Sequence, residues 1–187
     1  DSHLMRTIIF KPMGRTTMKI IFSLFSVLLA VTMMTGQAQA TSAKDLETIA
    51  RAVGFMNNGP TGAVSVDVVF DPANADSAAH ADEVIGLLAG GVGSKVTLTG
   101  KKVSAAGDIT SRVIFLTRGA GSLYGPALNT AAGNNGITVS TDDACLGNGC
   151  VLVVKTQPSV DILVSTAAAA KTNTEFASAF SMMITKK

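Results

Sequence analysis

The stretch RVIFL, residues 112–116, gives the clearest indication of a buried strand in this chain. Four apolar residues, Val113-Ile114-Phe115-Leu116, follow one another without a polar break. A strand with one face in water alternates apolar and polar residues, whereas a continuous apolar run is typical of a parallel sheet that helices cover on both faces. We therefore expect residues 113–116 to form the most buried strand of such a sheet.

The segments on either side of RVIFL alternate between the period of strands and the period of helices, which is typical of an α/β protein. Strands are expected at 63–70, 95–99, 101–105, 137–140, 151–155 and 160–164, and helices at 42–55, 77–88 and 122–132. The three turn-type residues 157–159 predict an antiparallel hairpin between the last two strands. The predicted fold is a three-layer α/β domain with a mostly parallel sheet and this C-terminal hairpin.

A closing helix is expected after the hairpin. The residues Thr172-Asn173-Thr174-Glu175 have the pattern of a helix capping box. An apolar stripe at helical spacing follows, made of Phe176, Phe180, Met183 and Ile184.

The first 40 residues have the pattern of a secretory signal peptide. Basic residues precede an uncharged apolar run over residues 20–34, and the segment ends in Ala38-Gln39-Ala40. The alternative is a membrane anchor, but the run is shorter than the roughly 20 residues that a bilayer requires. We expect cleavage after Ala40, export to the periplasm and a single mature domain at residues 41–187.

The charge of the chain belongs mainly to this leader. Four of the fifteen Lys and Arg and one of the thirteen Asp and Glu lie in residues 1–40, which leaves eleven basic and twelve acidic side chains. A nearly neutral mature chain gives no reason to expect nucleic acid or an anionic membrane as partner. No second long apolar segment follows, so the mature chain is not expected to insert into a membrane.

Both cysteines, Cys145 and Cys150, lie in the Gly- and Asn-rich stretch DDACLGNGC, residues 142–150. A zinc site needs further ligands, and a redox motif needs two residues between its cysteines rather than four. In an oxidising periplasm a pair at this spacing favours a structural disulfide. We expect no metal and no cofactor.

A glycine-rich turn follows RVIFL, with Arg118, Gly119, Gly121 and Ser122 before a predicted helix. Free N–H groups and a cation at a helix start can bind an anion. The alternative, an ordinary glycine-rich turn between strand and helix, is favoured because the spacing does not match a dinucleotide fingerprint.

His80, the only histidine after the leader, is expected on the exposed side of its helix. The adjacent Asp142 and Asp143 are expected to accept backbone hydrogen bonds in a turn. No nucleophile, base and orienting group can be assembled from these residues, so we expect no enzyme activity.

The order and spacing of four stretches resemble the YfiR/HmsC-like family of bacterial periplasmic regulators. These stretches are residues 113–116, 136–142, 149–154 and 160–164, the last running on into 178–183. The resemblance covers most of the mature chain and no catalytic motif carries it.

The resemblance implies a periplasmic regulatory protein that binds and restrains a membrane-bound signalling enzyme, such as a diguanylate cyclase. Such a protein would link the cell envelope to cyclic di-GMP signalling and biofilm formation. The alternative is a small-ligand periplasmic binding protein that serves a transporter. The identity of the partner, the signal sensed and the oligomeric state, including a homodimer, stay open.

Overall fold

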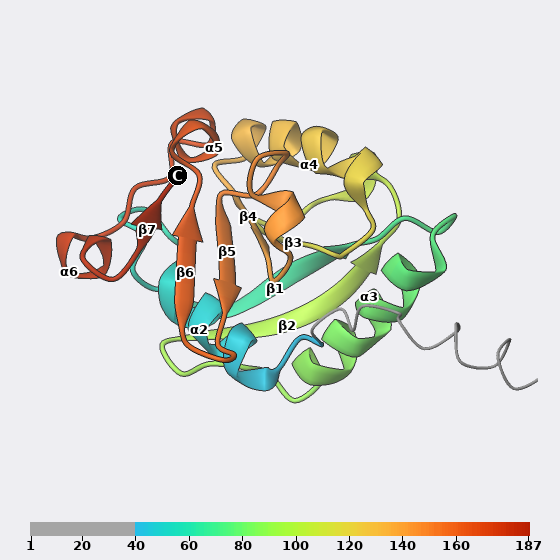
Figure 1. Cartoon of the computed structure of the whole chain (residues 1–187), viewed down its shortest axis with the longest axis horizontal. Coiled ribbons are helices and arrows are strands. Elements are labelled where there is room, and N and C mark those ends of the chain that lie inside the picture. Colours follow the sequence, from blue (N-terminus) through green and yellow to red (C-terminus); the bar gives the residue numbers. More distant parts are fainter. Residues whose placement is uncertain (1–39) are drawn as a thin grey trace, which may run out of the picture. The chain divides into compact units, whose positions relative to one another are not determined.

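The sheet has seven strands in the order β2-β1-β3-β4-β5-β6-β7, as the computed structural model of residues 40–187 shows (Figure 1). The strands are β1 (Gly62–Val69), β2 (Val96–Val103), β3 (Val113–Leu116), β4 (Ile137–Ser140), β5 (Leu152–Lys155), β6 (Asp161–Val164) and β7 (Thr185–Lys186). Strands β1 to β5 are parallel, and β6 runs antiparallel to β5. The predicted leader, including nearly all of its cleavage sequence, lies outside the described residues.

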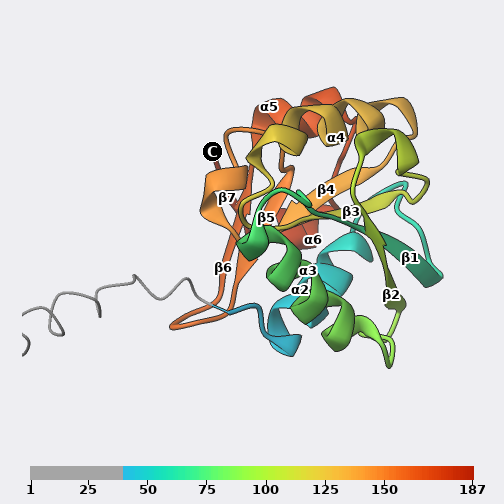
Figure 2. The same cartoon turned by 90° about the vertical axis from the view of Figure 1, so that its right-hand side faces the viewer.

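Helices cover both faces of this sheet. The helices α2 (Ala43–Val53) and α3 (Ala75–Leu88) lie on one face, and α4 (Gly121–Gly133) lies on the other (Figure 2). The 3-10 turns are η1 (Ala106–Asp108) and η2 (Asp143–Cys145), and two short helices, α5 (Thr166–Lys171) and α6 (Ser178–Ser181), follow the hairpin. The predicted α/β class, the mostly parallel sheet and the antiparallel pair β5–β6 are therefore confirmed.

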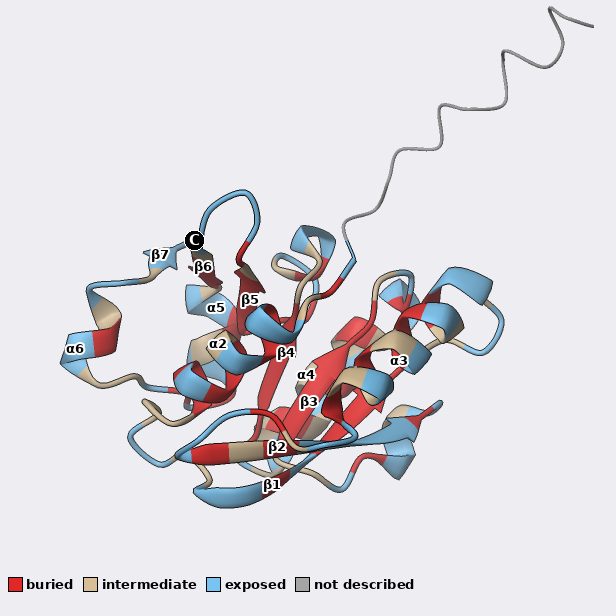
Figure 3. Ribbon diagram, turned by 90° about the horizontal axis from the view of Figure 1, so that it is seen from below, coloured by how far each residue is buried: buried red, intermediate tan, exposed pale blue. Residues whose placement is uncertain are grey.

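The RVIFL strand lies in the interior of the sheet, between β1 and β4. Val113 and Phe115 pack with the apolar side chains of α2 and α3, whereas Ile114 and Leu116 pack with those of α4. All four are fully buried, as are the four residues of β4, and the central strands are red in Figure 3. Apolar residues on both faces explain why this strand shows no alternation.

Helix α2 begins with the capping box that its sequence predicts. The Ser42 hydroxyl accepts the Asp45 N–H, and Asp45 Oδ2 accepts the Ser42 N–H at 2.7 Å. The other carboxylate oxygen, Asp45 Oδ1, accepts both the N–H and the hydroxyl of Thr156 at 2.8 and 2.7 Å. One buried carboxylate thus caps the helix and ties it to the residue that follows β5.

The expected strands 95–99 and 101–105 are a single strand, β2, that continues through Gly100. A Cβ atom at Gly100 would lie 2.8 Å from Ile85 Cδ1 and 2.9 Å from Leu88 Cδ1. Glycine is therefore present because α3 packs closely on the strand, and it does not mark a turn.

The expected closing helix is wrong. The helix α5 ends at Lys171, Asn173 adopts φ +51°, and only the four residues of α6 are helical after it. The Thr172 hydroxyl donates to the Ala168 carbonyl, and the buried hydroxyls of Thr172 and Thr174 lie 2.7 Å apart. These side chains bond the helix that precedes them, so the expected capping box does not form. Two short helices and the edge strand β7 replace it.

Candidate functional site

Polar side chains meet at the carboxyl ends of β1, β3 and β4. The strand order reverses between β1 and β3, and this is the place where open α/β sheets usually bind ligands. We call the following residues the carboxyl-edge cluster: Thr41, Asp71, Ser77, His80, Thr117, Ser122, Tyr124, Thr141 and Asp142.

His80 is the centre of this cluster, and its expected exposure is wrong because only 1% of the residue is exposed. The Arg118 N–H donates to His80 Nδ1 at 2.8 Å, so the proton of the neutral ring lies on Nε2. That Nε2 lies 2.7 Å from Thr41 Oγ1, which in turn lies 2.7 Å from Thr141 Oγ1. Burial, assisted by the charge of Arg118, lowers the pKa of His80 to about 4, against the opposing charge of Asp142.

Tyr124 closes the other side of the cluster. Its hydroxyl donates to the Thr117 carbonyl at 2.9 Å and lies 3.4 Å from Asp142 Oδ2. Burial, together with the negative charge of Asp142, raises the pKa of Tyr124 to about 12. The Thr117 hydroxyl lies 2.7 Å from Ser77 Oγ and donates to the Val69 carbonyl. The polar groups of this edge therefore bind mainly one another.

The predicted anion-binding turn borders the cluster. Gly119 adopts φ +78°, and the Asn74 side chain packs against it and donates to its carbonyl at 3.3 Å. Gly121 begins α4, and Ser122 Oγ donates to Asp71 Oδ2 at 3.2 Å. The Arg118 N–H is used by His80. A carboxylate of the chain itself thus lies at this helix start, where it opposes a second negative charge.

The cysteines form a disulfide in the crossover between the parallel strands β4 and β5. Cys145 and Cys150 are fully buried, with their Cα atoms 5.2 Å apart. Gly149 lies against the backbone of Tyr124, since a Cβ atom there would be 2.4 Å from the Tyr124 carbonyl oxygen. Parallel strands usually need a crossover of a dozen or more residues, and the disulfide holds this shorter one together.

Of the two adjacent acids, Asp142 accepts a backbone hydrogen bond as expected, whereas Asp143 forms an ion pair instead. Asp142 Oδ1 accepts the Ala144 N–H at 3.1 Å, and Asp143 pairs with Lys155.

A polar cavity of about 560 Å³ lies at the amino-terminal ends of the strands, where β1, β3 and β4 begin. We call it the amino-edge cavity. Three loops line it, the first after α2, the second between α4 and β4, and the third after α5, and Arg112, directly before β3, completes the lining. Its polar side chains are those of Asn57, Asn58, Arg112, Asn134, Asn135, Thr172, Asn173, Thr174 and Glu175. The sequence shows these residues only as turn-type runs, so the cavity was missed.

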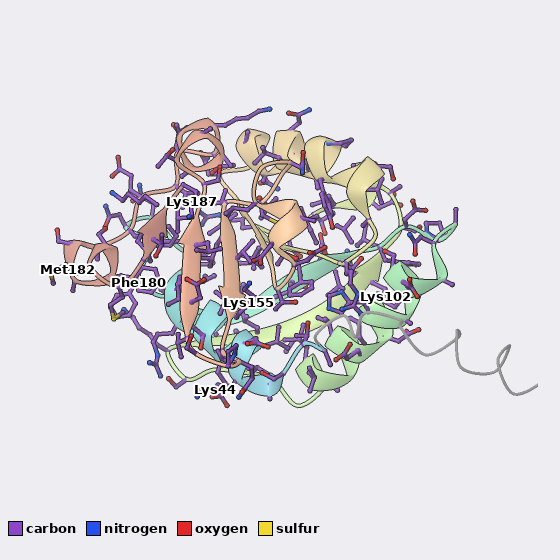
Figure 4. All side chains as sticks on the ribbon, in the orientation of Figure 1. Lys44, Lys102, Lys155, Phe180, Met182 and Lys187 are labelled. Carbon is purple, nitrogen blue, oxygen red and sulfur yellow. A yellow bond between two sulfur atoms is a disulfide. The ribbon has the colours of Figure 1, made fainter. Side chains whose placement is uncertain are left out.

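Three exposed large apolar residues lie directly before β6 and directly after α6. Val160, Met182 and Met183 are 56%, 85% and 54% exposed, and we call them the methionine patch. Val160 and Met183 line a hollow of about 240 Å³ with Phe180, Lys44 and Arg51. Figure 4 shows Met182 at the outer end of α6, while Phe180 points back into the domain.

Only the last two residues of β6, Leu163 and Val164, pair with β7.

Within residues 40–187, no helix is long and apolar enough to cross a membrane. The same residues contain no group of three or more His, Cys, Asp and Glu side chains that is placed to hold a metal ion.

No protein-family model matches the chain, and no curated protein is similar to it in sequence. Two solved structures have a similar fold. A conserved domain protein from Vibrio cholerae O1 biovar El Tor has a TM-score of 0.54 and 12% identity over 77% of this chain. The ligand-free, open structure of a substrate binding protein with adhesive properties from Clostridium difficile has a TM-score of 0.57 and 11% identity over 79%.

These similarities concern the fold alone. This chain spans 59% of the length of the first protein and 60% of the length of the second. Each neighbour therefore has a substantial part that this chain does not match.

Proposed function

We propose that the chain is a non-catalytic regulatory protein of the bacterial periplasm that binds the periplasmic region of a membrane-bound signalling enzyme, such as a diguanylate cyclase, and restrains it. The methionine patch carries this proposal. The resemblance to the YfiR/HmsC-like regulators supports it, and so does the buried disulfide, which is typical of an oxidising compartment.

The methionine patch has the composition of a protein-binding surface. Neighbouring exposed apolar side chains are unusual on a monomer, and methionine adapts its shape to a partner. Lys44, Glu47 and Arg51 border the hollow beside Met183, so the partner segment should carry charged side chains of both signs as well as apolar ones. The first half of β6 lies at the sheet edge beside this hollow, and an added strand of the partner can pair there.

The carboxyl-edge cluster supports a role without catalysis. His80 is its only histidine, and both ring nitrogens are used in buried hydrogen bonds. Such an imidazole cannot exchange a proton with a substrate unless these contacts break.

A photo-crosslinking amino acid at position 182 tests the proposal in the source bacterium. A matched control carries the same group at Lys102, which Figure 4 shows on the other side of the domain. We expect position 182, but not position 102, to crosslink to an integral membrane protein with diguanylate cyclase activity. Met183→Glu, combined with the crosslinker at position 182, should abolish the crosslink, and the double variant Met182→Glu, Met183→Glu should raise cellular cyclic di-GMP. Crosslinking at both positions, or an unchanged cyclic di-GMP level in the double variant, would count against the proposal.

The second candidate is a small-ligand binding protein that serves a transporter. The fold similarity to a substrate binding protein favours it. A ligand would then sit at the carboxyl ends of β1 and β3 and be closed over by a second body. A ligand-dependent rise in the unfolding temperature that Tyr124→Phe or Asp142→Asn removes would support this candidate. A ligand effect that both variants leave intact would oppose it.

A further inference from the structure

The amino-edge cavity contains amide groups that the fold does not use. The side chains of Asn58, Asn135 and Asn173 make no hydrogen bond to other described residues, although each lines the cavity. Asn134 Oδ1 is buried and accepts no hydrogen bond from the described part of the chain. The Asn134 amide nitrogen donates to the Ser111 carbonyl at 3.4 Å, so this side chain belongs to the wall of the cavity.

Arg112 holds two walls of the cavity in place. Its Nη2 donates to the carbonyls of Asn58 and Asn135 at 2.8 and 2.9 Å, and its Nε donates to Asn135 at 3.1 Å. One rigid guanidinium thus joins the loop before β1 to the loop before β4. The walls are fixed before any ligand arrives, which reduces the cost of ordering them on binding.

The charges of the cavity balance. Arg112 is its only cation among the described lining residues, and Glu175 is its only acid. Most of the donors of Arg112 are already used on carbonyls, and Glu175 Oε2 accepts from Asn57 Nδ2 at 3.3 Å. Because the charges of Arg112 and Glu175 balance, the lining offers no net charge to attract an ionic ligand. The cavity therefore favours a neutral ligand.

Two of the asparagines have the same unusual backbone. Asn135 and Asn173 both adopt φ +51°, a conformation that glycine reaches at lower cost. Asparagine is also common in this conformation directly after a helix, and here it places one amide after α4 and another after α5. A side-chain amide both donates and accepts hydrogen bonds, and so does a sugar hydroxyl.

We propose that the amino-edge cavity binds a neutral sugar, with the amides of Asn58, Asn135 and Asn173 holding its hydroxyl groups. The volume of about 560 Å³ lies within the range of roughly 300–1,000 Å³ that is typical of small-molecule sites. None of the three residues of the methionine patch lines this cavity. Sugar binding is therefore independent of the proposed regulatory contact and requires no protein partner.

Calorimetric titration of the chain with glucose, galactose and N-acetylglucosamine, each to about 10 mM, tests the site. Glucuronate and glucosamine serve as charged comparators. We expect at least one neutral sugar to bind with a Kd of about a millimolar, as suits a small polar ligand, and the charged sugars to bind more weakly. The double variant Asn135→Gly, Asn173→Gly keeps the backbone preference, removes two amides and should weaken binding at least about tenfold.

Asn129→Ala is the matched control, because Asn129 is exposed on α4 and bonds Lys171 away from the cavity. It should bind sugar as the unchanged chain does. If the double variant does not fold, Asn58→Ala on the exposed rim replaces it, with the same expected direction. Absence of binding by all three neutral sugars, equal binding by the cavity variant, or tighter binding of a charged sugar would each overturn the proposal.

Discussion

At the carboxyl edge of the sheet the polar side chains bind one another, whereas at the amino edge several of them face solvent without a partner. At the first edge Thr41 Oγ1 lies 2.7 Å from both His80 Nε2 and Thr141 Oγ1, so it links the two side chains. At the second edge three loops surround a cavity lined by amides. The fold predicts ligand binding at the carboxyl edge. In this protein the polar side chains at the carboxyl edge stabilise the fold. The polar side chains that stay accessible lie at the amino edge.

The difference has a physical origin in the residues before α2. Thr41 reaches across to His80 and Thr141, so the segment that precedes the first helix covers the carboxyl edge. No corresponding segment of the described chain covers the amino-edge cavity. Substitutions at the two edges should therefore have opposite profiles: large effects on stability at the carboxyl edge, and small effects on stability but large effects on binding at the amino edge.

The largest effect is expected for His80→Leu, which should lower the free energy of unfolding by about 3 kcal/mol. Leucine fills the space but leaves the Arg118 N–H and the Thr41 hydroxyl without their buried partner. His80→Asn, which can present an oxygen in place of Nδ1, should lose less. Urea unfolding at neutral pH measures both, and equal losses would show that these hydrogen bonds do not hold the edge together.

Removal of the disulfide should cost roughly 2 kcal/mol, the loop entropy of so small a ring. Cys145→Ala with Cys150→Ala should remain folded, because Val113, Phe115, Ile137 and Val139 pack in a core cluster that does not include the cysteines. The ring shapes the carboxyl edge through Gly149 and Tyr124, so the loss should add to that of His80→Asn only in part. Unfolding midpoints of the single, double and combined variants check this, and an unchanged midpoint without the disulfide would contradict it.

Acid should weaken the carboxyl edge. The unfolded histidine titrates near 6.5 and the buried one near 4, so the unfolded chain binds the extra proton in this window. Stability is therefore complete above about pH 6.5 and falls as the pH falls toward 4, by about 2 kcal/mol between pH 7 and pH 5.

The pKa of Asp67 is also shifted, but this carboxyl group does not change the stability between pH 7 and pH 5. Burial alone raises the pKa of Asp67, but the N–H groups of Ser111 and Thr110 and the charge of Lys101 bring it below its ordinary value. Its contribution is lost only at lower pH. His80→Asn should thus flatten the profile between pH 7 and pH 5, and a variant with the original slope would assign the acid sensitivity to another group.

The sequence predicted the sheet well because its signals are local. The apolar run 113–116 and the alternation elsewhere report burial directly, and the Ser42–Asp45 capping box is a contact between near neighbours. The closing helix failed because Thr172 and Thr174 bond backward onto α5 rather than forward. The local sequence pattern predicts a helix there. The hydrogen bonds of the two buried threonine hydroxyls override that pattern.

The sites were harder to predict for the same reason. The burial of His80 depends on Thr41, which lies 39 residues before it. The amino-edge cavity joins loops that are separated by more than 100 residues, such as those of Asn57 and Glu175. Neither arrangement leaves a short motif in the sequence. The glycine-rich turn at 118–122 does leave one, and in the structure it meets Asp71 rather than an open space.

The smallest effect is expected at the amino edge, where Asn135→Gly and Asn173→Gly should each change the free energy of unfolding by less than about 0.5 kcal/mol. Their side chains hold no other described residue, and glycine accepts the φ of +51°. The matched variants Asn135→Ala and Asn173→Ala should lose about 1 kcal/mol, because alanine is strained in this conformation.

Urea unfolding of the four variants separates the two roles of asparagine at these positions. Losses from glycine as large as those from alanine would mean that the amides stabilise the fold, and the contrast between the two edges would then disappear. Glycine variants of full stability, in contrast, would show that the fold needs only the backbone conformation. The amide groups at both rims would then be free to serve a ligand.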